Sequence, residues 1–241
     1  MMMKERSLKA AGMTLSTALV LAATVIINIY VPATRGYFNL GETMIYLVAL
    51  LFDPLTAAFA GGVGSALADV VLGYTIYAPA TLVIKAAEGA LASTLVRRLR
   101  GRQRGIFALS MGTVAAYFVV ILVIGYTLFV GEVELTLSGL LTLKGFIEPT
   151  SWILIASAAI ATPLYILIRK KGEIGLILIS LLSAGSIMIL GYYLYEQLIL
   201  GYYALAEVPV NLGQVVMGIA VAIPTYTLIT KYTRRTSQEN I

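Results

Sequence analysis

Residues 106–130 read IFALSMGTVAAYFVVILVIGYTLFV, a run of 25 residues without a charged side chain. At about 1.5 Å of rise per residue, a helix of this length crosses the roughly 30 Å hydrocarbon core of a bilayer. A membrane β-barrel would need strands that alternate apolar and polar residues, whereas residues 119–124 are all apolar. The run therefore predicts a transmembrane helix.

Similar runs recur from one end of the chain to the other and predict an all-α integral membrane protein, a polytopic bundle of about eight transmembrane helices in one membrane domain, residues 1–241. The expected spans are residues 9–31, 38–53, 55–74, 79–98, 106–130, 146–168, 174–200 and 207–230. The second is short, and Asp53-Pro54 at its end predicts a tight turn into the next helix. The first apolar stretch is too long for a cleaved signal peptide, so we expect it to be retained.

The composition excludes several classes of protein. Hydrophobic residues make up 59% of the chain and charged residues 12%, which rules out a soluble globular domain. Without Cys or His, the chain lacks the parts of thiolate and imidazole metal sites and of most nucleophilic catalysts. We expect no catalytic residues, no metal site and no cofactor. The net charge of +5 does not indicate nucleic acid, because that reading requires a basic face on a soluble domain.

The positive charges predict the orientation in the membrane. With eight spans, fourteen of the 17 Lys and Arg residues fall on the side of the termini, whereas Arg35 and Lys144 fall in loops on the opposite side and Lys85 lies within a span. The positive-inside rule then places both termini in the cytoplasm of a multi-pass protein of the cell membrane.

Two parts of the chain resemble each other. Residues 105–170 are similar to residues 173–231, most clearly where AIATPLY at 159–165 matches AVAIPTY at 220–226. We interpret them as a duplicated two-helix hairpin with one membrane orientation, as in transporters with parallel repeats. The alternative is that apolar helices resemble each other by composition alone.

Ionisable and amide side chains gather at one depth, in the outer half of the predicted bundle. Such groups are costly in a membrane and mark functional sites by default. The cluster contains Glu42, Asp69, Lys85, Glu88, Glu196, Glu207 and Asn211. An alternative for Lys85 and Glu88, three residues apart on one helix face, is that they only pair with each other. For Asp69 and Glu42, the alternative is that they cap helices or hold loops.

Tyrosines frame the same level and predict an interfacial belt, with some of them placed to stack on a flat heterocycle. They are Tyr37, Tyr74, Tyr77, Tyr192, Tyr193, Tyr195, Tyr202 and Tyr203. Ala18 and Ala22 form a small-residue face on the first span. Such a face suits either packing within the bundle or the docking of another membrane protein.

Three segments together carry a family resemblance: GYFNLGE at 36–42, GGVGSALAD at 61–69 and YAPATLVIKAAEG at 77–89. They resemble the substrate-binding S components of energy-coupling factor (ECF) vitamin transporters, in particular the group for riboflavin and hydroxymethylpyrimidine. The end of the chain, residues 191–196 and 206–212, is similar to the last two helices of that family. The departure is that family members have six helices. The resemblance thus implies core helices in residues 1–104, an inserted pair in 105–172, the final core pair in 173–231 and a cytoplasmic tail in 232–241.

The resemblance implies a high-affinity subunit that captures a small vitamin or vitamin precursor from outside. Its partners would be the lipid bilayer, a transmembrane coupling protein (the T component) and two cytoplasmic ATPases, with no nucleic acid. Docking on the coupling protein would use Ala18 and Ala22. The implied pocket takes Asn39 together with the acidic cluster, and the full set of candidate substrate-binding residues is Asn39, Glu42, Asp69, Lys85, Glu88, Tyr192, Glu196, Glu207 and Asn211.

Two other functions remain as alternatives. A stand-alone ion-coupled transporter or channel would need ionisable groups through the inner half of the bundle, where the sequence offers none in a chain. An intramembrane enzyme is disfavoured by the lack of His and Cys. Because the cluster is acidic, we expect phosphorylated vitamins to bind less tightly than the free forms.

Overall fold

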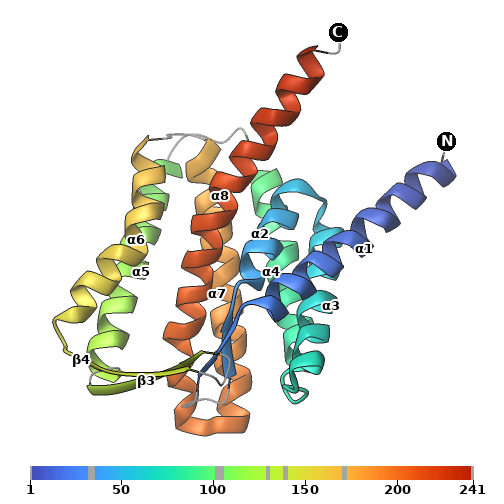
Figure 1. Cartoon of the computed structure of the whole chain (residues 1–241). Coiled ribbons are helices and arrows are strands. Elements are labelled where there is room, and N and C mark those ends of the chain that lie inside the picture. Colours follow the sequence, from blue (N-terminus) through green and yellow to red (C-terminus); the bar gives the residue numbers. More distant parts are fainter. Residues whose placement is uncertain are drawn as a thin grey trace.

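The computed structural model describes residues 2–31, 36–100, 106–128, 131–137, 141–169 and 173–239. Within these ranges the chain forms eight α-helices, one 3-10 helix and four strands (Figure 1). The helices are α1 (Met2–Ile26), α2 (Gly41–Leu51), α3 (Pro54–Leu72), α4 (Ala78–Leu99), α5 (Ile106–Leu128), α6 (Ser151–Arg169), α7 (Glu173–Leu200), η1 (Gly201–Ala206) and α8 (Val208–Glu239). Both termini lie at one end of the bundle, where parts of α1 and α8 extend beyond it (Figure 1).

The outside of the bundle is apolar. In the described residues six helices, namely α1, α3, α4, α5, α7 and α8, are long and apolar enough to cross a membrane. Large apolar side chains face outward: Leu154 is 75% exposed, Leu228 69% and Val83 67%. A continuous apolar exterior suits lipid acyl chains rather than water. The prediction of an all-α polytopic membrane bundle is confirmed.

Helix α2 corrects the span expected at residues 38–53. The helix covers only Gly41–Leu51, and its 11 residues reach about 16 Å, too short to cross a bilayer alone. The expectation fails because residues 36–39 pair as a strand instead of continuing the helix. Almost every residue of α2 is buried, and α1, α3, α4 and α8 surround it. The short helix therefore forms the centre of the bundle.

The turn predicted at Asp53-Pro54 is confirmed. The Asp53 side chain accepts hydrogen bonds from the backbone N–H groups of Leu55 (3.1 Å) and Thr56 (3.3 Å). Pro54 occupies the first turn of α3, where its missing N–H costs nothing. The chain therefore reverses within two residues and packs α3 beside α2.

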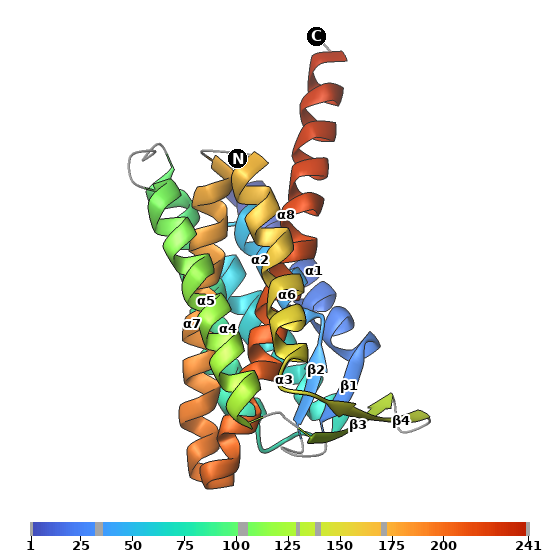
Figure 2. The same ribbon diagram turned by 90° about the vertical axis from the view of Figure 1, so that its left-hand side faces the viewer.

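Four strands form an antiparallel sheet in the order β2-β1-β3-β4, at the end of the bundle opposite the termini (Figure 2). They are β1 (Asn28–Val31), β2 (Gly36–Asn39), β3 (Gly131–Leu137) and β4 (Leu141–Ile147). None was predicted, and the ends of the spans expected at 9–31 and 146–168 were wrong because they included strand residues. Outside the helices these apolar segments satisfy their backbone groups by pairing with one another.

Small residues set the spacing of α3 and α4. A Cβ on Gly62 would lie 2.6 Å from the carbonyl oxygen of Leu82, and a Cβ on Gly89 would lie still closer to the carbonyl oxygen of Ala57. Only glycine permits this approach of the two backbones. The close contact fixes the positions of the α3 and α4 side chains that point to the centre.

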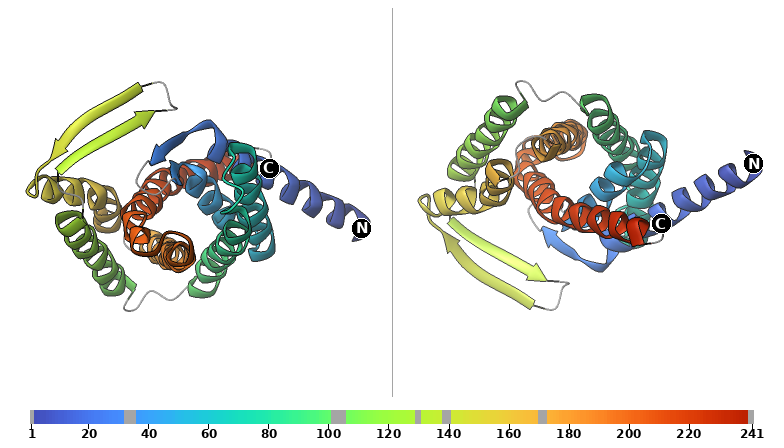
Figure 3. Two further views of the ribbon diagram at one scale, coloured as in Figure 1. Left: turned by 90° about the horizontal axis from the view of Figure 1, so that it is seen from below. Right: turned by 90° about the horizontal axis from the view of Figure 1, so that it is seen from above.

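The pair α5–α6 lies on the outer side of α7 and α8 (Figure 3). The Tyr117 hydroxyl donates to the carbonyl oxygen of Leu182 (2.9 Å), and the Ser110 hydroxyl donates to that of Gly175 (3.0 Å). Within the pair, Trp152 packs against Gly125. The α5–α6 pair thus packs against α7 and α8, and helices α1–α4, α7 and α8 make up the rest of the bundle.

Candidate functional site

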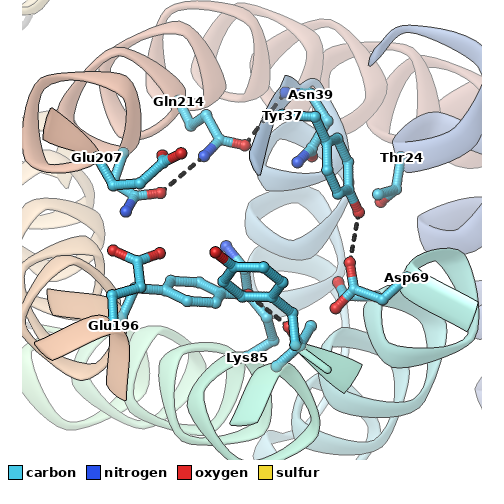
Figure 4. A pocket seen from close by; sticks show the side chains of 13 residues that line it. Thr24, Tyr37, Asn39, Asp69, Lys85, Glu196, Glu207 and Gln214 are labelled. Atoms are coloured by element: carbon cyan, nitrogen blue, oxygen red, sulfur yellow. Dashed lines mark hydrogen bonds between the residues drawn. The ribbon is translucent and has the colours of Figure 1, made fainter. Parts of the chain in front are cut away.

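A cavity lies between the helix ends at the end of the bundle that carries the sheet (Figure 4). Its empty space, counted together with the open solvent at its mouth, is about 490 Å³. Its lining is polar and aromatic: Thr24, Tyr37, Asn39, Ser65, Asp69, Tyr77, Thr81, Lys85, Tyr192, Glu196, Glu207, Asn211 and Gln214. None of these residues belongs to α5 or α6.

Lys85 forms part of the floor and is held by two carboxylates beneath it. It ion-pairs with Glu42 of α2 and with Glu88 of its own helix, the latter at 3.4 Å between Nζ and Oε2. The Tyr46 hydroxyl donates to Glu88 Oε1 at 2.9 Å. All four side chains are buried. Because two carboxylates face one ammonium group, the charge of Lys85 is compensated from below.

Asp69 forms one wall, in the last turn of α3. The helix ends at Gly73, whose φ of +87° is the left-handed conformation that glycine adopts without strain. The Tyr37 hydroxyl of β2 donates to Asp69 Oδ1 at 2.7 Å, and the Tyr37 ring stacks on Tyr74 with centroids 4.6 Å apart. Burial, followed by the charge of Asp69, raises the pKa of Tyr37, so this hydroxyl remains a donor. Asp69 Oδ2 is buried and accepts no hydrogen bond.

Glu196 and Glu207 form another wall. Glu196 lies near the end of α7 and Glu207 directly before α8, so η1 brings them together, and Figure 4 shows both side chains on the same side of the cavity. Both residues are less than 5% exposed, and Glu196 Oε2 accepts no hydrogen bond. Burial, then the charges of Glu196 and Glu207, raise the pKa of Tyr77. This wall therefore carries two buried carboxyl groups close together.

Amide groups connect β2 to α8 beside that wall. The Gln214 side chain donates from Nε2 to Asn211 Oδ1 at 2.9 Å, and Gln214 Oε1 accepts from the backbone N–H of Asn39 at 3.2 Å. Asn39 Oδ1 in turn accepts from the N–H of Gly41 at 2.8 Å, at the start of α2. These bonds fix the strand that carries Tyr37 to the helix that carries Asn211.

The structure brings most of the predicted substrate-binding residues together. Those that line the cavity are Asn39, Asp69, Lys85, Tyr192, Glu196, Glu207 and Asn211. Glu42 and Glu88 lie beneath Lys85, where they pair with it instead of facing the cavity. The spacing offered the alternative that Lys85 and Glu88 only pair with each other; the structure shows this ion pair, but Lys85 also pairs with Glu42 and lines the cavity.

Sequence reasoning missed six lining residues: Thr24, Tyr37, Ser65, Tyr77, Thr81 and Gln214. Tyr37 and Tyr77 were recognised only as members of the tyrosine belt. Gln214 carried a usable signal, because it lies three residues after Asn211 and therefore on the same face of α8. Ser and Thr gave no signal, since in apolar helices they commonly bond their own backbone, as Thr24 does to the carbonyl oxygen of Val20 at 2.8 Å.

Ala18 and Ala22 lie on the free side of α1. The buried positions of this helix are Ser16, Val20 and Thr24, which face the bundle. Ala18, two residues from Ser16 and Val20, is exposed, and Ala22 is half-buried. The small-residue face is thus directed away from α3 and is open to the membrane.

The site is equipped to bind a flat polar molecule. Its carboxylates accept hydrogen bonds, its amides donate and accept them, and the Tyr192 ring, bonded through its hydroxyl to Thr81 at 2.9 Å, offers an aromatic surface. Within the described part of the chain, no group of three or more carboxylates is arranged to hold a metal ion.

Comparison with known proteins gives two findings. The model of a family described as "ECF-type riboflavin transporter, S component" matches residues 6–170. A Pyrococcus woesei protein, named only as an uncharacterised protein in a gap 3′ region, is 56% identical over 72 residues, which are 30% of this chain and 48% of that protein. The chain therefore spans about half the length of this relative. The family match includes α5 and α6 and ends before α7, so it does not separate residues 105–172 from the rest.

Proposed function

The chain belongs to the family of ECF-type riboflavin transporter S components, and on that premise we propose that it is the membrane-embedded, high-affinity substrate-binding subunit of an ECF-type importer. Its substrate is a small vitamin or vitamin precursor, namely riboflavin, hydroxymethylpyrimidine or a similar heterocycle. The family consists of transport subunits, and the chain acts by binding and not by catalysis.

One observation carries the proposal: the buried carboxylate and ammonium side chains among the described residues either line one cavity at one end of the bundle or pair with Lys85 in its floor. In a membrane protein such groups are costly unless they serve a ligand or each other. Asp69, Glu196 and Asn211 come from α3, α7 and α8, and their side chains meet at this cavity. A site assembled from so many helix ends suits capture of a solute at the membrane surface.

The orientation follows from the basic residues. The cavity lies at the end of the bundle opposite both termini (Figure 1). Arg97, Arg98 and Arg100 lie at the end of α4 that is away from the cavity. By the positive-inside rule that end faces the cytoplasm, and the cavity opens to the outside.

A subunit of this kind needs partners to move its ligand inward. We assign this role to a transmembrane coupling protein and two cytoplasmic ATPases, because the chain has no nucleotide-binding motif of its own. The exposed side of α1 around Ala18 and Ala22 is the docking surface for the coupling protein, since small side chains permit close helix approach.

The ligand is tested by mass spectrometry of the small molecule that copurifies with the full chain in mild detergent, followed by calorimetric titration with that compound. We expect a vitamin-like heterocycle that binds the chain alone and enters liposomes only when the coupling protein and ATPases are present with ATP. Ion-driven uptake by the chain alone would instead support a stand-alone transporter.

Docking is tested with Ala18→Leu combined with Ala22→Leu. This variant should bind ligand normally but lose ATP-driven uptake, because the added bulk keeps the coupling protein from α1. Ala158→Leu with Ala161→Leu is a matched control, since both alanines are exposed on α6. Normal uptake by the α1 variant would remove this surface from the proposal.

A further inference from the structure

Tyr74 and Asp69 are joined by two routes beside the cavity. The backbone N–H of Tyr74 donates to the carbonyl oxygen of Asp69 at 2.7 Å. The Tyr74 ring stacks on the ring of Tyr37, whose hydroxyl donates to the Asp69 carboxylate at 2.7 Å. Tyr37 and Asp69 line the cavity, and Tyr74 is not among the thirteen described residues that do so. The three residues therefore form a closed circuit of contacts in which Tyr74 lies outside the lining.

The end of α3 fixes the first of these routes. Gly73 takes the left-handed conformation, with a φ of +87°, and its N–H donates to the carbonyl oxygen of Val70 at 3.3 Å. Together with the bond from Tyr74 to Asp69, this makes the pair of hydrogen bonds of a Schellman motif, which ends a helix. The motif sets the position of Tyr74 relative to Asp69 through the backbone alone.

The second route depends on how the Tyr37 ring is held. Tyr37 belongs to β2, an edge strand of the sheet, and a tyrosine ring turns about two side-chain torsions. The Tyr74 ring stacks on the Tyr37 ring with centroids 4.6 Å apart and an interplanar angle of 30°. Because this stacking restricts both torsions, the Tyr37 hydroxyl keeps its direction toward Asp69.

We propose, on the basis of the proposed function, that Tyr74 is a positioning residue for ligand binding. Its ring holds the Tyr37 ring, and the Tyr37 hydroxyl in turn holds the Asp69 carboxylate in the cavity wall. A carboxylate that is already ordered loses less freedom when a ligand binds, and this preorganisation raises the affinity. Tyr74 therefore contributes to affinity without touching the ligand.

Titrations of the purified full chain test the ring of Tyr74, with riboflavin and hydroxymethylpyrimidine as probes. We expect Tyr74→Leu to weaken binding of a probe by about 3- to 10-fold, the size of one aromatic pair. Tyr74→Phe keeps the ring and should bind within about twofold of the unaltered chain. Tyr126→Leu is the matched control, since Tyr126 is 62% exposed on α5. Unchanged affinity of Tyr74→Leu, or an equal loss in Tyr74→Phe, would overturn the inference.

A double variant shows whether Tyr74 acts through Tyr37. Tyr37→Phe removes the hydroxyl that donates to Asp69 and should lower the affinity by itself. Once residue 37 lacks this hydroxyl, Tyr74→Leu should cause little further loss, because the group that Tyr74 positions is absent. A residue that only supports the fold would show its full effect in both backgrounds. Additive losses would therefore contradict the inference.

Hydrogen–deuterium exchange of the ligand-free chain separates this inference from the proposed function. Tyr74→Leu should speed exchange of the backbone amides of residues 36–39, because β2 loses one of its attachments to the helices. The unaltered chain, Tyr74→Phe and Tyr126→Leu should all exchange slowly there. Unchanged exchange in α2, at the centre of the bundle, shows that the variant is folded. Tyr74→Met takes the place of Tyr74→Leu if the latter does not fold.

The exchange measurement decides the inference even without a ligand. If neither probe binds the unaltered chain and no small molecule copurifies with it, the proposed function fails while this test still applies. Equal exchange of residues 36–39 in the Tyr74 variants and the unaltered chain would overturn the inference and leave the proposed function standing.

Discussion

The pairs α5–α6 and α7–α8 differ in their place relative to the cavity although their sequences are similar. Gly191-Tyr192 of α7 corresponds to Gly125-Tyr126 of α5 in the predicted duplication. Tyr192 lines the cavity and donates to Thr81, whereas Tyr126 is 62% exposed on the outside of the bundle. Likewise Glu207 is buried at the cavity, and Glu148, its counterpart, is exposed. The same residue type therefore lines the cavity only where neighbouring helices enclose it.

The connections of the two pairs differ as well. Helices α7 and α8 are joined by the short η1, which holds Glu196 and Glu207 close together. Helices α5 and α6 are separated by β3 and β4, and β3 pairs with β1 at Ile29 and Tyr30. The α5–α6 pair thus reaches the cavity only indirectly, through the sheet that carries Tyr37.

The largest effect is expected from Lys85→Met, which removes the buried ammonium group that pairs with two carboxylates. The variant leaves Glu42 and Glu88 buried without their cation, and such a loss costs about 3–5 kcal/mol. We expect a large fall in the free energy of unfolding in detergent and loss of ligand binding. Lys9→Met is the control, because its ion pair with Asp53 is half-exposed (49% and 42%) and worth about 0–1 kcal/mol. Equal stability of the two variants would show that the buried ion pairs do not hold the core.

The sequence predicts helices more readily than strands in this chain. Runs without charge define the membrane helices, because a charge there is costly. The same apolar residues suit a strand at the membrane surface, so Asn28–Val31 and Leu141–Ile147 could not be told from helix ends or loops. Each becomes a strand by pairing with a neighbour nearby in the chain, β1 with β2 and β4 with β3, and β1 also joins β3 from a distant part of the chain.

The sequence predicts how deep in the membrane the candidate site residues lie, but not the direction in which their side chains point. Acidic residues are rare in spans, which placed Glu42, Glu88 and Glu196 at one level. Helices that are apolar on nearly all sides give little indication of which face points inward. The sequence therefore could not separate Glu42 and Glu88, which hold Lys85 from below, from Glu196, which faces the cavity.

A smaller effect is expected from glycine substitutions that strain either the contact between α3 and α4 or the contact between α5 and α6. Gly89→Ala pushes a Cβ against the backbone of Ala57 and separates α3 from α4, at a cost of about 1–3 kcal/mol. Gly125→Ala meets the Trp152 side chain and strains only the α5–α6 pair. We expect Gly89→Ala to weaken ligand binding in titrations and Gly125→Ala to lower stability without changing affinity. Gly112→Ala, with open space around it, is the control. Weaker binding by Gly125→Ala would show that strain in the α5–α6 pair reaches the cavity.

The smallest effect on binding is expected from deletion of residues 105–172. Helix α4 ends and helix α7 begins at the same end of the bundle, and two antiparallel helices leave together, so the remaining six helices keep their topology. All thirteen residues that line the cavity stay in place.

The deletion has two structural consequences. The surfaces of α7 and α8 that α5 and α6 covered become exposed to lipid, which is as apolar as the helices it replaces. The sheet loses β3, and with it the backbone pairing at Ile29 and Tyr30, but the β1–β2 hairpin that carries Tyr37 keeps its own register. We therefore expect ligand affinity to change by less than about threefold, below the effect of one lost hydrogen bond. A shortened chain that inserts with the correct topology, as shown by accessibility of tags at both termini, yet binds no ligand would show that α5 and α6 belong to the binding site.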